Sequence, residues 1–150
     1  MYIQGKIFLA TTSNTIKLIT IQDITDRKIN ILNKSFDNVF RVYNQAGFLI
    51  QRIHVDPDFK PMVDIFKDIY ITMSYATLQE HVPEIDRAIK IIKERFRALY
   101  HLLPVNAILK VMVRCGAKDV VKWLNMFPNK GGVSNTYIPI EILTAKPVNY

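Results

Sequence analysis

The sequence predicts a mixed α/β domain, in which helices cover a five-stranded sheet. Three observations predict this class: the opening residues are rich in β-branched and aromatic side chains, apolar residues recur at helical spacing from Asn30 onward, and the predicted elements follow the order β-β-β-α-β-(α)-β-α-α. With 150 residues, the chain has the length of one domain. We assign residues 1–127 to this domain and residues 128–150 to a loop-like C-terminal tail.

Three extended runs open the chain and predict an antiparallel meander. They are Tyr2–Ile3, Lys6–Thr12 and Ile16–Ile21, and each is rich in residues with high strand propensity. The segments around Gly5 and Asn14 separate the runs and have the composition of tight turns.

The hydrophobic period changes after the meander. Asn30–Gln45 predicts a helix, because its apolar residues recur every three or four positions and Gly47 follows as a stop signal. Phe48–Val55 predicts a buried strand, Phe59–Lys67 a short helix and Ile69–Met73 a fifth strand.

The longest predicted element is a helix from Val82 to Leu103. Pro83 suits its first turn, where the missing N–H has no helical partner, and Pro104 ends it. Its buried stripe consists of apolar residues that advance by steps of three and four: Ile85, Ile89, Ile92, Phe96, Leu99 and Leu103. A second helix is predicted over Val105–Phe127.

The composition constrains the class of protein and its partners. The net charge of +7 favours a polyanionic partner, and a basic protein without such a partner is the alternative. The single cysteine, Cys115, excludes a disulfide framework and is predicted to be a buried, inert thiol. The N-terminus lacks a signal-peptide pattern and no apolar run reaches the ~20 residues of a membrane span, so we expect an intracellular protein without a membrane partner. Nothing in the sequence predicts a small-molecule cofactor.

Acidic residues gather at the ends of two predicted elements. Asp56 and Asp58 follow the Phe48–Val55 strand, and Glu84 and Asp86 open the long helix. Loops at strand ends are common ligand sites in α/β sheets, and converging carboxylates suit Mg²⁺ or Mn²⁺, which prefer oxygen ligands. Two such ions activate a nucleophile and stabilise the leaving oxygen of a phosphodiester. The alternative is that these acids only cap a turn and a helix.

Basic residues form a stripe on the long helix, beside its apolar face. Lys90, Lys93 and Arg97 lie along one line with Asp86. Three further basic residues lie outside this line: Arg87, Arg95 and His101. Lysines one or two turns from a carboxylate cluster would hold a phosphate backbone over the metal ions. The alternative is a solvated face held by Asp86–Lys90 and Lys90–Glu94 ion pairs.

Several short sequence words carry a resemblance to a known family. They are Val42–Phe48, Ile53–Phe59, Gln79–Arg87, Ile92–Arg97 and Phe127–Ser134. Together they resemble the integrase segment of copia-type retrotransposon polyproteins, whose catalytic core has the ribonuclease-H-like fold of retroviral-type integrases. The resemblance runs over effectively the whole chain, and the order of the predicted elements is similar to that fold.

The resemblance implies a Mg²⁺- or Mn²⁺-dependent integrase that uses three acids, Asp-Asp-Glu. Asp56 matches the second acid, and Asp86, which precedes Arg87, stands where the third acid is expected; Glu84 is the other candidate for that role. The first acid aligns just upstream of Met1, so the resemblance implies a truncated first strand and impaired catalysis. Asp86 also has one methylene fewer than Glu, which moves its carboxylate by ~1.5 Å.

The same resemblance implies a retrotransposon remnant whose partner is DNA, with Lys90, Lys93 and Arg97 as the contacts, and a nuclear location for an integrase. Two further interpretations stay open. One is a non-enzymatic nucleic-acid-binding module that keeps the fold and the basic stripe. The other is a dimerising interaction protein, a homo-oligomer that uses the helix over Val105–Asn125 as its partner surface.

Overall fold

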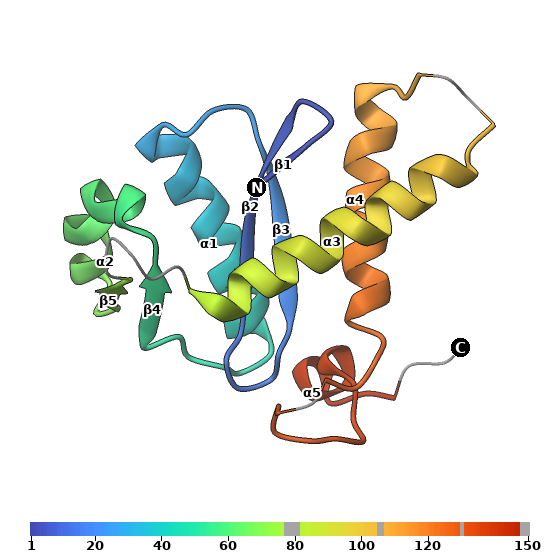
Figure 1. The fold of residues 1–150 in the computed structure, drawn as a ribbon. Helices are drawn as coiled ribbons and strands as arrows, with labels where there is room; N and C mark the ends of the chain where they lie inside the picture. The colour runs from blue at the N-terminus through green and yellow to red at the C-terminus, as the bar shows by residue number, and fades with distance from the viewer. Residues whose placement is uncertain (77–81, 105–106, 130, 148–150) are drawn as a thin grey trace.

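The computed structural model describes residues 1–76, 82–104, 107–129 and 131–147, and it confirms the mixed α/β class (Figure 1). The strands are β1 (Tyr2–Ile3), β2 (Lys6–Thr12), β3 (Ile19–Ile24), β4 (Arg52–Val55) and β5 (Thr72–Tyr75). The helices are α1 (Ile29–Gln45), α2 (Val63–Asp68), α3 (Pro83–Leu102), α4 (Lys110–Leu124) and α5 (Pro139–Thr144), and a 3-10 helix over Pro57–Met62 precedes α2. Within these described ranges no helix has the length and hydropathy that crossing a membrane requires.

The strands pair in two groups. β1, β2 and β3 form the predicted antiparallel meander, in which Ile7 lies opposite Ile24. β4 and β5 pair in parallel, with Arg52 opposite Thr72. Among the described residues β4 forms no ladder with β1, beside which we expected it, because the two residues of β1 leave few backbone groups for a second partner.

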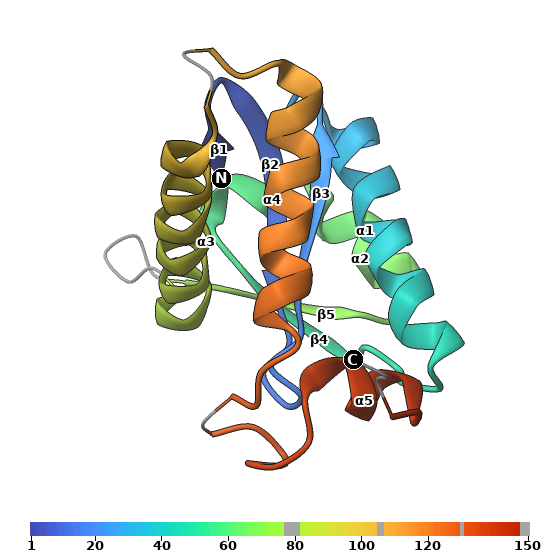
Figure 2. The ribbon, with the colours of Figure 1, turned by 90° about the vertical axis from the view of Figure 1, so that its right-hand side faces the viewer.

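The meander is the middle of three layers. Figure 2 shows β1–β3 with α1 on one side and with α3 and α4 on the other. Successive side chains of a strand point to opposite faces of a sheet. Phe8 is buried with residues of α3 and α4, whereas the adjacent Leu9 is buried with residues of α1 and α2. The meander therefore carries apolar side chains on both faces.

α3 crosses the meander and buries a narrower stripe than we predicted. Ala88, Ile92 and Phe96 are buried in one cluster with β2, β3 and α4. Leu99, however, is 39% exposed and Leu102 is 81% exposed. The C-terminal turns of α3 extend past the strands (Figure 1), so these leucines have no sheet to cover.

Three strands begin later than the sequence predicted. The predicted buried strand Phe48–Val55 is a strand only over β4, which begins at Arg52 and in which Val55 alone is buried. β3 begins at Ile19 because residues 13–18 form the turn, in which the Ser13 N–H donates to the Leu18 carbonyl at 2.9 Å. β5 begins at Thr72 because the Ile71 N–H still donates to the Phe66 carbonyl at the end of α2, at 2.9 Å. In both β3 and β5, hydrogen bonds within a local turn occupy backbone groups that the predicted strands would have used to pair with a neighbouring strand.

The C-terminal third also differs from the prediction. Val105, where we predicted the start of the second long helix, lies outside the described residues, and α4 begins at Lys110. The buried residues of α4 recur at helical spacing: Val113, Ala117, Val120 and Val121. Cys115 lies off this face and is exposed, so the prediction of a buried thiol is wrong. The segment after residue 128 contains α5, whose Ile140 packs in a cluster with α1 and the β2–β3 turn.

One buried amide joins α4 to the meander. Asn125 follows α4 and is 5% exposed. Its Oδ1 accepts a hydrogen bond from the Ile19 N–H at 2.9 Å, and its Nδ2 donates to the Ile19 carbonyl at 2.7 Å. The side chain thus satisfies both backbone groups at the start of β3, as a neighbouring strand would.

We expect Asn125→Ala to lower the free energy of unfolding by about 2–4 kcal/mol, because it leaves two buried backbone groups of Ile19 unpaired. Urea denaturation followed by circular dichroism measures the change. The control is Asn135→Ala, at an exposed position, where we expect a change below about 0.5 kcal/mol. An Asn125→Ala protein as stable as the parent chain would contradict the assigned role.

Candidate functional site

The basic stripe on α3 lies in solvent as the sequence predicted. Lys90, Lys93 and Arg97 are exposed, and their spacing places them within about 60° of one another around the helix axis. Among the described residues none of the three forms an ion pair, and the Asp86–Lys90 and Lys90–Glu94 pairs of the alternative interpretation are not present. Within the described ranges the stripe therefore presents its charge to solvent without a carboxylate partner.

The stripe is longer than the sequence analysis proposed. His101, which we placed outside it, lines the same groove as Lys93 and Arg97. The step from Arg97 to His101 is one helical turn of four residues, so the periodicity that found the other three also applies here. The expectation that His101 lies apart from the stripe is therefore wrong.

Asp56 lies where β4 ends and the 3-10 helix begins. Its backbone carbonyl accepts a hydrogen bond from the Phe59 N–H at 3.1 Å, but its side chain makes no capping hydrogen bond. The carboxylate of this half-buried residue is therefore not used as a cap. The capping alternative thus does not describe the Asp56 side chain.

The α-amino group of Met1 lies in the field of charged side chains from several segments. This group donates to the Phe8 carbonyl at 2.9 Å. Burial lowers the pKa of the amino group, the positive charges of Arg27 and Lys93 lower it further, and the negative charge of Asp56 acts in the opposite direction. Charged side chains that follow β4, lie on α3 and lie in the β3–α1 connection therefore all act on the α-amino group of Met1.

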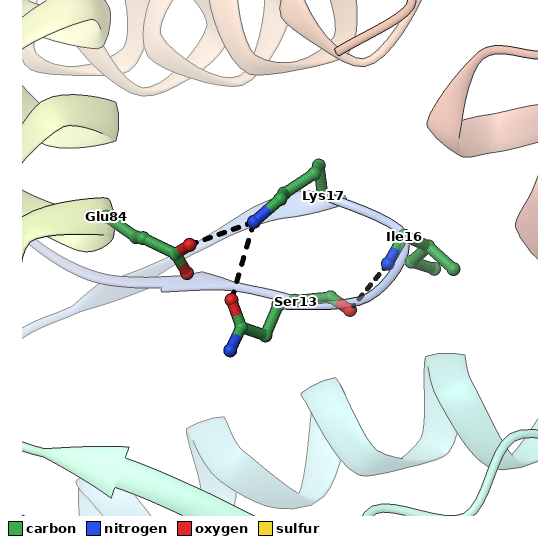
Figure 3. A network of polar contacts seen from close by, with 5 residues as sticks. Ser13, Ile16, Lys17 and Glu84 are labelled. Atoms are coloured by element: carbon green, nitrogen blue, oxygen red, sulfur yellow. Dashed lines mark hydrogen bonds and ion pairs between the residues drawn. The ribbon is translucent and has the colours of Figure 1, made fainter. Parts of the chain in front are cut away.

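Glu84 and Asp86 face different surroundings, although both lie in the first turn of α3. Glu84 Oε1 accepts a hydrogen bond from Lys17 Nζ at 2.9 Å, at the β2–β3 turn, and Asn14 contacts the same pair (Figure 3). Asp86 lies about 200° around the helix from Glu84. It is exposed and forms no ion pair with any described residue. Glu84 thus anchors α3 to the hairpin, and Asp86 stays available to a ligand.

The remaining acid of the predicted cluster has a partner of its own. Asp58 lies 3.7 Å from Arg27, with both side chains largely exposed. In the part of the chain that the structure describes, no three His, Cys, Asp or Glu side chains lie together as metal ligands. A Mg²⁺ or Mn²⁺ ion held by Asp56 and Asp86 stays a prediction.

Comparison with known proteins identifies the fold. The sequence matches no protein-family model and no curated protein. The structure is similar to the catalytic core domain of BIV integrase, with a TM-score of 0.68 and 16% sequence identity, over 97% of this chain and 90% of that chain. The chain therefore has an integrase-core, ribonuclease-H-like fold, as the sequence analysis predicted.

We expect Lys17 and Glu84 to be weakly coupled, because an exposed ion pair contributes at most about 1 kcal/mol. A double-mutant cycle of Lys17→Gln and Glu84→Gln, followed by urea denaturation, measures the coupling free energy. The matched control replaces Glu84→Gln with Asp86→Asn, for which we expect no coupling to Lys17. Coupling of Lys17 to Asp86 instead of Glu84 would reverse the assignment of the two acids.

Proposed function

We propose that this chain is an integrase-core-like domain, from a copia-type retrotransposon remnant, that binds duplex DNA through phosphate contacts. The observation that carries the proposal is the row Lys90, Lys93 and Arg97, which is exposed and has no carboxylate partner within the described residues. The similarity of the fold to an integrase catalytic core supports the same proposal. A nuclear location follows from this function.

The charge of the chain favours a sequence-independent contact. The net charge is +7, and lysine and arginine side chains that bind phosphates release the counterions condensed on DNA. Phosphate contacts set the position of a protein on the duplex, whereas base contacts would be needed to read sequence. We therefore propose that the α3 row binds duplexes of different sequence with similar affinity.

The catalytic part of the proposal concerns Asp56 and Asp86. Both carry carboxylate oxygens, the ligand type that Mg²⁺ and Mn²⁺ prefer, and neither carboxylate is taken by a cap or an ion pair with a described residue. Bound there, such an ion would polarise a phosphodiester and activate an attacking hydroxyl. Of the three acids that the resemblance requires, this sequence supplies Asp56 and, one methylene short, Asp86. We therefore propose a domain with impaired catalysis.

A second candidate function has one observation in its favour. Trp123 and Phe127 are 65% and 53% exposed, and their ring centroids lie 5.7 Å apart at the end of α4. Exposed aromatic residues are enriched in protein interfaces, so α4 suits the dimerising interaction protein of the sequence analysis. That function predicts little salt-dependent binding to nucleic acid.

We expect the double variant Lys90→Ala, Lys93→Ala to bind a duplex more weakly, by the same factor for different sequences. The slope of log K against log salt concentration should flatten by at most about two units, because each lost phosphate contact contributes about 0.9. Fluorescence anisotropy with labelled duplexes at several salt concentrations measures both quantities.

The matched control is Lys34→Ala, Lys67→Ala, which removes two exposed lysines from α1 and α2, away from α3. We expect this control to change the slope much less. Absent or salt-insensitive binding of the parent chain would contradict the DNA proposal and favour the interaction protein.

We expect no detectable strand transfer by residues 1–150 with Mg²⁺ or Mn²⁺, because two carboxylates supply too few ligands for two ions. A gel assay with a labelled donor duplex and a plasmid target measures the activity. Strand transfer that disappears in Asp56→Asn but persists in Asp58→Asn would overturn the proposal of impaired catalysis. It would also establish Asp56 as a catalytic residue.

A further inference from the structure

A groove that the proposed function has not used lies between the β1–β2 turn and the C-terminal half of α3. It has a volume of about 370 Å³ and is open to solvent. Its walls include Tyr2, Gln4, Lys93, Arg97, Tyr100 and His101. None of the described residues that line the groove is acidic.

The basic side chains of the groove form one row. Lys93, Arg97 and His101 follow one another at four-residue steps, so they lie on one helix face over about 12 Å. Lys93 and Arg97 also belong to the row that we propose to bind a duplex, and His101 continues that row toward the C-terminus of α3. A phosphate backbone that leaves the duplex site would therefore meet further cations along α3.

The opposite wall of the groove provides an aromatic ring. Tyr2 is 51% exposed, and the guanidinium of Arg27 lies 5.2 Å from the centroid of its ring. Tyr100, which is half-buried and packs edge-on against the ring of His101, also lines the groove. Exposed aromatic rings beside cations are the combination on which unpaired bases stack in proteins that bind single strands. The bases of an intact duplex are stacked inside it and cannot use these rings.

The turn between β1 and β2 holds this wall in place. Ile3 pairs with Lys6, so Gln4 and Gly5 form a two-residue hairpin turn, and both have positive φ, 44° and 72°. The turn fixes Gln4 at the edge of the groove, where its amide can donate to and accept from the edge of a base.

We propose that the groove binds an unpaired DNA strand that continues from a duplex held on Lys90 and Lys93. The phosphates lie on Lys93, Arg97 and His101, and a base stacks on Tyr2. An acidic peptide would satisfy the cations but would offer no base to stack on the exposed part of the Tyr2 ring. This inference rests on the proposed duplex binding. It adds that the domain prefers a duplex end that carries an unpaired strand.

The test compares two labelled DNAs by fluorescence anisotropy: a blunt duplex and the same duplex with an unpaired extension of a few nucleotides. We expect the extension to tighten binding at least about fivefold through base stacking. Tyr2→Leu should remove this gain and leave the affinity for the blunt duplex unchanged, whereas Tyr2→Phe, which keeps the ring, should retain it.

Matched controls separate the groove from the rest of the surface. Tyr70→Leu removes a tyrosine that is 94% exposed after α2, and we expect it to keep the gain. Arg97→Gln should reduce the gain more than Arg95→Gln, because Arg95 lies on the same helix but outside the groove.

The outcomes distinguish this inference from the proposed function. Failure of the blunt duplex to bind overturns the proposed function. If the blunt duplex binds but the unpaired extension does not raise the affinity, the groove assignment alone is overturned. The same holds if the extension still raises the affinity in Tyr2→Leu. An acidic phosphopeptide that removes the gain as efficiently as an unlabelled single strand would also overturn it, because such a peptide offers no base to stack.

Discussion

The β2–β3 ladder pairs Ile7–Thr12 with Ile19–Ile24, and its side chains alternate between two faces that both have to be covered. Phe8 and Leu9 are adjacent in the chain yet belong to different hydrophobic clusters, one with α3 and α4 and the other with α1 and α2. This alternation makes the ladder the centre of a three-layered domain. It also determines the rotation of α3 about its axis, because Ile92 and Phe96 have to face the ladder. The basic row of α3 then has only solvent to face.

Three ion pairs of the structure connect segments that are distant in the sequence. In the described part of the chain, Lys17 pairs with Glu84, Arg114 with Asp23, and Arg27 with Asp58, and these pairs connect different segments of the fold. The cations of α3 have no such partners within the same ranges. Many lysines and arginines elsewhere in the described residues also form no ion pair, so the row on α3 is distinguished by the alignment of its three cations along one helix face. Two members of this row, Lys93 and Arg97, also line the groove beside β1.

Much of the candidate site could be predicted, because it depends on spacing within single elements. Lys90, Lys93 and Arg97 follow from helical periodicity, and Asp56 follows from its place after a strand. His101 obeys the same periodicity and could have been included. Tyr2 could not be found in this way, because only the packing of β1 beside α3 brings it to the groove, and Arg27 lies over its ring from another segment. The different surroundings of Glu84 and Asp86 could not be predicted either, because they depend on the residues that each side chain contacts in the fold. Glu84 pairs with Lys17, which is 67 residues away in the sequence.

Local composition and periodicity determined which elements form, their order and the mixed α/β class, because strand propensity and helical spacing act over a few neighbouring residues. The same local pattern decided that α3 has a buried and a basic face. Tertiary structure alone decided why Leu99 and Cys115 are exposed and which strands share a ladder. It also decided that the Asn125 amide completes the start of β3 from 106 residues away. The physical reason is that burial and hydrogen-bond pairing depend on segments that meet only after folding, and no single stretch of sequence contains both partners.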